Sequence, residues 1–481
     1  MNTLEGDVVA VVGLAASGWA AARLALEKGG KVHVSDLRTD AATLARGAEL
    51  RALGAEVDLG EHPLDRIVGA TTVVVSPGVP PDAPILKELS GRGIRWISEP
   101  EFAFRFFDGP LIAVTGTNGK TTTAVLVAHM LEEDGLDVAL GGNIGAAFGP
   151  PASELALREK SPAWYVVEMS SFQLAGIDRF KPDIGVMTNL APDHLDRYES
   201  VESYYADKAN LFRNADEDSR WVLNGDDPAV DALAQGVSGR CFYFGKSRVA
   251  RPGADLGGVH PGAHPAGDRA AHRAAYIDGT MLTLDVSGAE EEVAPIQDIS
   301  LLGAHNLENA LAASIAARLA GASMESLRRG LSTAEPLPHR TERVAEAGGI
   351  LWVNDSKATN VAAARSAISS LDGALLVLLG GKDKGEDFSP LVVALSDADA
   401  RVLTFGEAAP RIFEALDGHV PVELLSGGFD VVMKAAAQRA VPGTTVLLSP
   451  ACSSYDMFTN YEERGVRFAT LAKAMSEDVE H

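Results

Sequence analysis

The sequence predicts an α/β protein of three domains, with a Rossmann-like parallel sheet at each end and a P-loop ATPase-like domain between them. Apolar strands alternate with Ala-rich helices in the first and last parts of the chain, a pattern typical of parallel sheets covered by helices. A strand, a Gly-rich loop and a helix follow one another at 111–125. The chain has 481 residues, enough for several hydrophobic cores. The expected domains span residues 1–109, 110–337 and 338–481.

The composition is that of a soluble α/β protein and limits its partners. Hydrophobic residues make up 46% of the chain, charged residues 22%, and the formal net charge is -24. Such acidity argues against broad nucleic-acid binding, which needs a basic surface. Only Cys241 and Cys452 are present, which suits a reducing compartment. Because we find no basic start leading into an apolar core and no apolar run long enough for a bilayer, we expect a cytoplasmic monomer that binds small molecules and neither nucleic acid nor membrane.

The first domain opens with a strand, the loop GLAASG and an Ala-rich helix. Gly13 and Gly18 keep the spacing of the dinucleotide fingerprint G-x-G-x-x-G, but the middle position is Ala15, and the second strand ends at Asp36. This pattern favours a nucleotide such as a UDP-sugar. NAD(P) binding and a purely structural turn are the alternatives.

A further strand at 72–75 runs into SPGVPP, which contains Ser76 and Gly78. Ligands of open α/β sheets sit at the carboxyl ends of strands, so this loop is a candidate binding loop. Ordinary turn chemistry is the alternative interpretation.

The stretch LIAVTGTNGKTTTAV at 111–125 reads as a phosphate-binding loop. Gly116 and Gly119 let the backbone approach a ligand, and the following helix directs free N–H groups at phosphate oxygens. Lys120 would contact the β and γ phosphates, and the hydroxyl of Thr121 would bind Mg²⁺. Val114 stands where the familiar motif has a Gly, so the loop is a shorter variant. The alternative is a Gly-rich turn that happens to precede a lysine.

Polar side chains follow the next strands of the central domain. Asn143 lies in a Gly-rich turn, Glu168 ends the apolar run 164–167, and the strand at 184–188 is followed by Asn189, Asp193 and His194. The carboxyl ends of parallel strands converge, so we expect Glu168 and His194 to lie beside the phosphate loop, with Glu168 as a metal-binding acid. Taken singly, His194 is as well explained as a helix cap or a packed residue.

Other residues of the central domain carry weaker signals. Lys208 lies on a predicted helix, where composition alone favours a solvated surface lysine. The Pro, Gly and His-rich run at 247–275 predicts a long flexible loop, and its irregularly spaced histidines argue against a metal site. A helix predicted at 307–319 carries Asn309, one turn beyond Asn306 and on the same face.

The third domain has four recognisable strands, and the loops that follow them are rich in Gly and polar residues. These loops carry Asp355, Lys357, Lys382, Lys384, Ser453 and Ser454. The rim they form is locally basic on an acidic protein, and it therefore favours an anionic ligand. A set of solvated loops is the alternative.

At this point the motifs carry a family resemblance. TGTNGKTTT, NIG, VVEMSSFQL, PDHL, GAHNLENALAA, PHRTE, DSKATN, GGKDKG and SPACSSYDMFTNYEERG, in this order, resemble the signature runs of the ATP-dependent Mur ligases. The resemblance covers all three domains. DSKATN, GGKDKG and SPACSSYDMF, with GLAASG and SPGVP, are most similar to the members that join D-glutamate to UDP-N-acetylmuramoyl-L-alanine in peptidoglycan precursor synthesis.

The resemblance implies a role for each motif position. ATP would be bound by Gly116, Thr117, Asn118, Gly119, Lys120, Thr121, Thr122, Asn309, Arg340 and Asp355. The UDP substrate would contact Asp36, Arg38, Ser76, Gly78 and Asn143, and D-glutamate would contact Thr359, Lys384, Ser454 and Tyr461. The implied catalytic set is Lys120, Glu168, His194 and Lys208, with two Mg²⁺ sites formed by Thr121, Glu168, His194 and Lys208, the last carbamylated. Ala15 and Leu37 depart from the family's uridine-binding pattern.

The chemistry that the resemblance implies is activation of a carboxylate by ATP to an acyl phosphate, which an amine then attacks. The enzyme's task would be positioning and charge stabilisation. A Mur ligase for another amino acid or a folylpolyglutamate synthetase would share the central domain, but the loops DSKATN and SPACSSYDMF argue against them. An NAD(P)-dependent oxidoreductase leaves the phosphate loop unexplained. A nucleotide-gated binding module would bind ATP without forming a ligated product.

Overall fold

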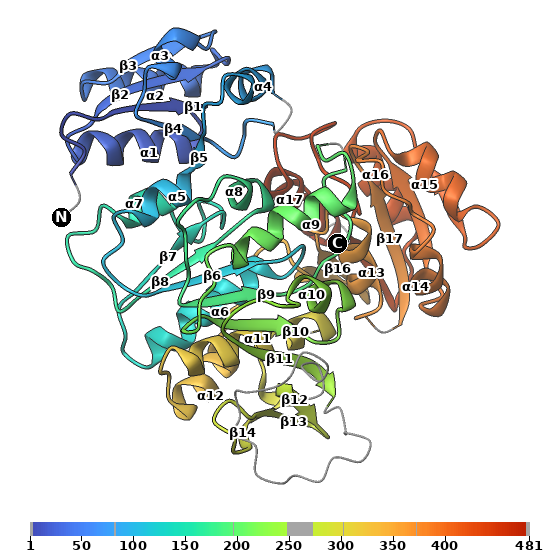
Figure 1. Ribbon diagram of the computed structural model, residues 1–481. Coiled ribbons are helices and arrows are strands. Elements are labelled where there is room, and N and C mark those ends of the chain that lie inside the picture. The colour runs from blue at the N-terminus through green and yellow to red at the C-terminus, as the bar shows by residue number, and fades with distance from the viewer. Residues whose placement is uncertain are drawn as a thin grey trace. The chain divides into compact units, whose positions relative to one another are not determined.

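The computed structural model describes residues 3–80, 83–195, 197–247, 273–301, 303–371 and 373–477 (Figure 1). The chain divides into two compact units. The first comprises Met1–Leu190, Arg197–Ile299 and Glu308–Ala334, and the second comprises Ala191–Asp196, Ser300–Leu307 and Glu335–His481.

The first unit begins with a five-stranded parallel sheet, in the order β3-β2-β1-β4-β5. Its strands are β1 (Val8–Val12), β2 (Lys31–Asp36), β3 (Glu56–Leu59), β4 (Thr72–Val75) and β5 (Ile97–Ser98). The helices are α1 (Ala16–Glu27), α2 (Ala41–Ala52), α3 (Leu64–Val68), α4 (Pro84–Gly91) and α5 (Glu99–Phe104). Along β1, Val9 and Val11 join one hydrophobic cluster while Ala10 and Val12 join another. Since both faces of the strand are buried, its sequence is continuously apolar.

A nine-stranded sheet follows in the same unit, in the order β14-β13-β12-β11-β10-β9-β6-β8-β7. Its strands are β6 (Leu111–Thr115), β7 (Val138–Gly142), β8 (Trp164–Glu168), β9 (Ile184–Met187), β10 (Arg220–Asn224), β11 (Arg240–Ser247), β12 (Arg273–Asp278), β13 (Met281–Leu284) and β14 (Glu291–Pro295). The strands from β7 to β12 are parallel, and β12, β13 and β14 pair antiparallel. Strand β6 lies between β8 and β9, so the loop after it is flanked by the ends of both neighbours.

The helices of this second sheet are α6 (Lys120–Glu133), α7 (Ala152–Leu155), α8 (Ser171–Ala175), α9 (Val201–Ala209), α10 (Pro228–Leu233), α11 (Ala304–Leu319) and α12 (Met324–Thr333). Helix α6 starts at Lys120, directly after Gly119 of the loop. The predicted loop at 247–275 falls mostly outside the described residues, as do His260, His264 and His272. Strands β11 and β12 reach Ser247 and Arg273, where the loop was expected to begin and to continue.

The second unit contains a six-stranded sheet in the order β15-β16-β20-β17-β18-β19, in which only β15 is antiparallel among the described strands. Its strands are β15 (Glu342–Ala347), β16 (Ile350–Asn354), β17 (Ala374–Gly380), β18 (Arg401–Phe405), β19 (Val422–Leu424) and β20 (Thr444–Leu448). Its helices are α13 (Val361–Ile368), α14 (Leu391–Asp397), α15 (Ala409–Leu416), α16 (Phe429–Arg439) and α17 (Tyr461–Glu477). The three parallel-rich sheets confirm the predicted fold class.

Within the first unit, α5 joins the two sheets through buried carboxylates. Glu101 accepts hydrogen bonds from the backbone N–H groups of Asp178, Arg179 and Phe180. Glu99, two residues earlier, accepts one from the N–H of Ser153. Both glutamate residues have no exposed surface. These contacts fix the segment that leads from the first sheet into the second.

None of the helices in the described part of the chain is long and apolar enough to cross a membrane.

Candidate active site

The phosphate loop joins β6 to α6 and depends on two glycines. Gly116 has φ +138° and Gly119 has φ +80°, which L side chains rarely adopt. A Cβ atom would lie 2.0 Å from Thr188 Oγ1 at Gly116 and 2.1 Å from Asn309 Oδ1 at Gly119. Backbone conformation and space therefore both require glycine at these positions.

Two residues that follow β9, Thr188 and Asn189, form hydrogen bonds with the phosphate loop. The hydroxyl of Thr188 donates to the carbonyl of Asn118 (2.6 Å), and the side-chain oxygen of Asn189 accepts from the N–H of Asn118 (2.9 Å). The N–H of Thr117 donates to the carbonyl of Asn189 (2.8 Å). Asn189 was expected at the end of the strand at 184–188, but no contact with the phosphate loop was predicted for it or for Thr188. Their position after a strand that neighbours β6 was the available signal.

Thr121 and Glu168 form a hydrogen bond at the carboxyl ends of the strands of the nine-stranded sheet. Thr121 Oγ1 donates to Glu168 Oε2 (2.7 Å), and Asn143 Nδ2 donates to Glu168 Oε1 (3.2 Å). Thr121 and Glu168 are both buried. The first turn of α6, the end of β8 and the turn after β7 thus contribute to one polar cluster.

Two lysines contact backbone carbonyls of the loop. Lys120 Nζ donates to the carbonyl of Thr117 (2.8 Å), and Lys208 Nζ donates to the carbonyl of Gly116 (2.7 Å). Lys208 is only 1% exposed, and its Nζ lies 4.8 Å from the ring centroid of Tyr204. The solvated lysine that composition favoured is therefore wrong: α9 directs Lys208 at the phosphate loop.

Asn309, on α11, also reaches the loop. It is buried, and its Oδ1 accepts from Thr123 Oγ1 (3.3 Å). The same oxygen is the atom that excludes a side chain at Gly119. Thr122 is also buried, in the first turn of α6.

In the first sheet, the carboxylate of Asp36 organises the turn after β1. Its Oδ2 accepts from the N–H of Leu14 (2.6 Å) and from Arg38 Nη2 (2.8 Å), and its Oδ1 accepts from the N–H of Arg38 (2.8 Å). Burial acts to raise the pKa of Asp36, but these donors outweigh it and hold the pKa below its usual value. The adjacent Leu37 is 61% exposed. Asp36 therefore stands as a carboxylate that links the glycine turn to Arg38.

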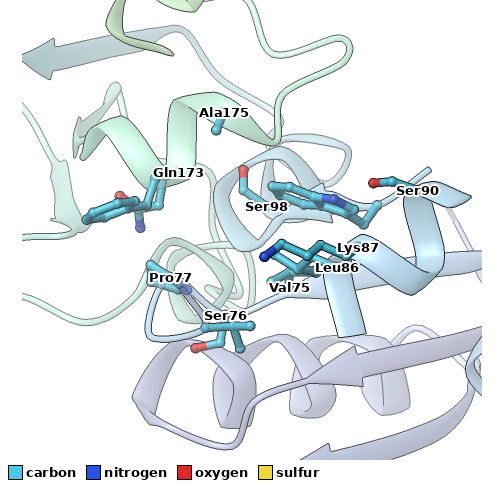
Figure 2. A pocket seen from close by; sticks show the side chains of 12 residues that line it. Val75, Ser76, Pro77, Leu86, Lys87, Ser90, Ser98, Gln173 and Ala175 are labelled. Carbon is cyan, nitrogen blue, oxygen red and sulfur yellow. The ribbon is translucent and has the colours of Figure 1, made fainter. Parts of the chain in front are cut away.

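Ser76 lines a cavity of about 360 Å³ in the first unit (Figure 2). The walls come from the end of β4 and its loop, α4, β5 and α8: Val75, Ser76, Pro77, Val79, Leu86, Lys87, Ser90, Trp96, Ser98, Phe172, Gln173 and Ala175. Among the described residues, no atom forms a hydrogen bond with the buried hydroxyl of Ser76. A Cβ atom at Gly78 would meet nothing within 4 Å. The cavity thus combines apolar walls with hydroxyl, amide and ammonium groups.

In the second unit, Asp355 lies at the end of β16. Its Oδ2 accepts from Ser449 Oγ (2.8 Å), and its Oδ1 accepts from the N–H of Thr341 (3.2 Å). Burial raises the pKa of Asp355 to about 7, against the opposing effect of these donors and of Arg340 and Arg464. Arg340 is in the turn before β15, next to Thr341, whose φ is +45°.

Lys384 is buried in the second unit and forms an ion pair with Asp193. Its Nζ also lies 3.8 Å from Glu386 Oε1. Burial raises the pKa of Glu386 to about 7, although Lys384 opposes the shift. Burial also acts to raise the pKa of Asp193, but the charge of Lys384 overcomes it and the pKa lies below the usual range. Asp193 was expected only as a polar residue after the strand at 184–188, and Glu386 was not singled out from the sequence.

Arg464 connects the loops DSKATN and SPACSSYDMF of the second unit. It is fully buried and donates to the hydroxyl of Ser356 (Nε, 2.9 Å) and to the carbonyl of Cys452 (Nη1, 3.1 Å). Ser454 is buried beside this contact, and Lys357 Nζ lies 3.8 Å from the ring centroid of Tyr461. Thr359 is half-buried in the DSKATN loop. Sequence reasoning missed Arg464, although it lies in the run YEERG.

His194 falls in the segment that belongs to the second unit, whereas Lys120, Thr121, Glu168 and Lys208 belong to the first. Its φ is +55°, uncommon for a residue with a side chain. The expected meeting of His194 with the phosphate loop stays a prediction. The residues that the structure describes contain no group of three or more His, Cys, Asp or Glu side chains placed to hold a metal.

A family model matches the region of each of the three sheets. The family models for the Mur ligase MurD-like N-terminal domain, the Mur ligase middle domain and the Mur ligase glutamate ligase domain match residues 7–98, 114–317 and 339–452. A protein of Acidobacterium capsulatum named UDP-N-acetylmuramoylalanine--D-glutamate ligase is 42% identical over 471 residues, which are 98% of this chain and 97% of that protein. The chain belongs to the Mur ligase family.

Further comparisons agree with membership of the Mur ligases. A protein of the same name from Geobacillus kaustophilus is 40% identical, over 95% of each chain. Among solved structures, a pseudomurein peptide ligase type C from Methanothermus fervidus aligns with a TM-score of 0.60 at 21% identity, covering 98% of this chain and 100% of that one. MurC from Thermotoga maritima aligns with a TM-score of 0.57 at 17% identity, covering 97% and 99%. These structures share the fold.

The family assignment confirms the prediction of an ATP-dependent, amide-forming ligase. It disfavours the oxidoreductase and the nucleotide-gated binding module.

Proposed function

We propose that this Mur ligase joins D-glutamate to UDP-N-acetylmuramoyl-L-alanine, with conversion of ATP to ADP and phosphate, as a step of peptidoglycan precursor synthesis. The observation that carries the proposal is the near full-length similarity to proteins named for this reaction, such as the 42% identity over 98% of the chain. The cluster of Thr121 and Glu168 beside a phosphate loop supports the chemistry.

The reaction needs a carboxylate to be activated before an amine can displace an oxygen from it. The carboxylate of the muramoyl substrate attacks the γ phosphorus of ATP, ADP leaves, and an acyl phosphate remains. The ammonium of D-glutamate loses a proton, the resulting amine attacks the acyl carbon, and inorganic phosphate leaves with the second amine proton. Lys120 and the N–H groups of the loop and of the first turn of α6 hold the phosphates and offset the charge that develops on them.

The residues present suit Mg²⁺, which prefers oxygen ligands and keeps contacts to phosphate and water. Thr121 Oγ1 and Glu168 Oε2 lie 2.7 Å apart and are buried, so one hydroxyl and one carboxylate face the same point at the loop. These two residues would hold the first ion. When bound, Mg²⁺ neutralises charge on the phosphate oxygens.

A second Mg²⁺ site would use His194 and Lys208, with Lys208 carbamylated. The ammonium group of a lysine does not bind a metal. Carbamylation turns the end of the side chain into an anionic, carboxylate-like group that can bind one. The burial of Lys208 and its contact with the carbonyl of Gly116 support this assignment, because the modified end would remain at the loop.

The other proposed roles concern the binding of the three substrates. Asp36, Arg38, Ser76, Gly78 and Asn143 bind the UDP substrate, and the cavity beside Ser76 supplies room for part of it. Gly116, Thr117, Asn118, Gly119, Thr122, Asn309, Arg340 and Asp355 complete the ATP site. Thr359, Lys384, Ser454 and Tyr461 bind D-glutamate. We further propose domain boundaries at 1–109, 110–337 and 338–481, a monomeric state and a cytoplasmic location without nucleic-acid or membrane partners.

The test is phosphate release from ATP with UDP-N-acetylmuramoyl-L-alanine and a panel of amino acids, with the ligated product identified by mass. We expect release with D-glutamate and little with L-glutamate or a diamino acid. Activity with one of those amino acids but not with D-glutamate would show that the acceptor is wrong. ATP binding without any ligated product would contradict the proposed reaction.

A further inference from the structure

We propose that the ion pair of Asp193 and Lys384 is the receptor for the zwitterionic head of the acceptor amino acid, with Asp193 binding its α-ammonium group and Lys384 a carboxylate. This inference rests on the proposed function and adds Asp193 as a specificity-determining residue of the acceptor site.

The pair is buried and held in place within the second unit. Asp193 is 6% exposed and Lys384 is 8% exposed. One carboxylate oxygen of Asp193 accepts from Lys384 Nζ, and the other accepts from Asn360 Nδ2 at 3.0 Å. Asn360 is the N-cap of α13, and its Oδ1 accepts from the N–H of Ala363 (2.8 Å). The position of the Asp193 carboxylate is therefore tied to the start of a helix.

Glu386 closes a ring of contacts around the lysine. Its Oε1 lies 3.8 Å from Lys384 Nζ, and its Oε2 accepts from the N–H of Val361 (3.0 Å), the first residue of α13. In the described part of the chain, no hydrogen-bond donor reaches Oε1. One ammonium thus serves two buried carboxylates, and the cluster has more negative groups than positive ones.

In the structure the ammonium of Lys384 is paired with Asp193, although Lys384 is proposed to bind a carboxylate of the substrate. A buried charge without a partner is costly, so an acid can take Lys384 from Asp193 only if Asp193 gains another cation. An α-amino acid brings both charges. Its carboxylate replaces Asp193 at Lys384, and its ammonium replaces Lys384 at Asp193, so that the single Asp193–Lys384 ion pair becomes two ion pairs and Asp193 keeps a cation.

We therefore expect the acceptor site to discriminate against glutarate, which has both carboxylates of glutamate but no amino group. Glutarate at Lys384 would leave Asp193 buried without its cation. In the native enzyme we expect the inhibition constant of glutarate to exceed the KM for D-glutamate by roughly tenfold or more, the usual effect of one charged hydrogen bond.

The decisive variant is Asp193→Asn, which keeps the shape and removes the charge. We expect the KM for D-glutamate to rise roughly ten- to a hundredfold with a much smaller change in kcat, because a ground-state contact is lost. Glutarate should bind as well as before or better, since Lys384 no longer has to leave a carboxylate. The matched control is Asp430→Asn, which removes an exposed partner of Arg467 in the same unit.

Equal shifts for D-glutamate and glutarate in Asp193→Asn would overturn the inference, because a merely structural role weakens both ligands alike. Thermal unfolding checks that the variant is folded. If it is not, the native enzyme still decides: equal binding of glutarate and D-glutamate would overturn the inference without any variant. Absence of D-glutamate ligation by the native enzyme is a separate result, and it would overturn the proposed function together with this assignment.

Discussion

The hydroxyl of Thr121 donates a hydrogen bond to the carboxylate of Glu168 across 2.7 Å, although the two residues are 47 positions apart in the chain. The contact exists because β6 and β8 are parallel neighbours, with Val114 paired to Glu168. Thr121 lies in the first turn of the helix after β6 and Glu168 ends β8, so both lie at the carboxyl ends of these parallel strands. Two oxygen ligands for a hard cation are thereby placed beside the phosphate loop.

The first prediction concerns Glu168. Glu168→Gln keeps the size of the side chain but removes the charge that Mg²⁺ requires, and we expect kcat to fall by roughly a hundredfold or more. Phosphate release, titrated with Mg²⁺, measures the effect. The control is Glu325→Gln, at an exposed position on α12, which should behave as the native enzyme does. An unchanged response to Mg²⁺ in Glu168→Gln would remove this residue from the metal site.

Lys120→Ala should abolish phosphate release, because the ammonium that neutralises the transferring phosphate is lost. Binding of the UDP substrate should persist, since Asp36 and Ser76 belong to the first sheet and its loops, and Lys120 is not among the residues that line the cavity. Calorimetric titration with the UDP substrate separates the two effects. A variant that lost both would indicate general damage to the unit, while one that kept turnover would contradict a phosphoryl-transfer role.

The prediction for Lys208 tests whether turnover requires this lysine. Lys208→Ala should lose activity, and added bicarbonate should not restore it because no amine remains to be carbamylated. The matched variant Lys246→Ala removes a lysine that is paired with Glu308 near the end of β11, where the side chain is 59% exposed, and it should stay active. Turnover near the native rate in Lys208→Ala would rule out the carbamate.

Sequence reasoning found the fold and the loop because local patterns determine both. A buried parallel strand reads as an apolar run, as in β1 and β6, and a glycine at positive φ cannot be replaced without strain, as at Gly119. The ends of such strands could therefore be located without coordinates. Thr121 and Glu168 were singled out in this way.

Contacts between residues that are distant in the chain could not be found in the same way. Asp193 meets Lys384 across 191 positions, and Arg464 reaches Ser356 across 108. No spacing rule connects such pairs, because the connection depends on which loops fold together. The burial of Lys208 was hidden for a related reason: composition places lysine at the surface, and only the packing of α9 against the loop overrides it.

Two glutamates on α5 give predictions of opposite sign. Glu101 is fully buried and its carboxylate accepts the N–H groups of residues 178–180. Glu101→Gln replaces one accepting oxygen with a donor and weakens charge-assisted bonds, so the first unit should unfold about 2–4 °C lower. Thermal unfolding followed by circular dichroism measures this. No change in the unfolding temperature would show that these bonds do not stabilise the unit.

Glu99 should respond differently because burial opposes its charge. Burial raises its pKa to about 7 from an unfolded value of 4.5, while the N–H of Ser153 opposes the shift. Between these two pH values the folded state holds a proton that the unfolded state has released, so stability falls as pH rises from about 4.5 to 7 and is then level with respect to this group. Glu99→Gln carries no charge at any pH. It should remove this part of the decline and make the protein more stable than the native one at pH 8, by up to about 3 kcal/mol. Unfolding midpoints of Glu99→Gln, Glu101→Gln and the native protein, measured from pH 5 to 8, test the sign. A native-to-variant difference for Glu99→Gln that stays constant over this range would show that Glu99 is ionised in the folded protein throughout.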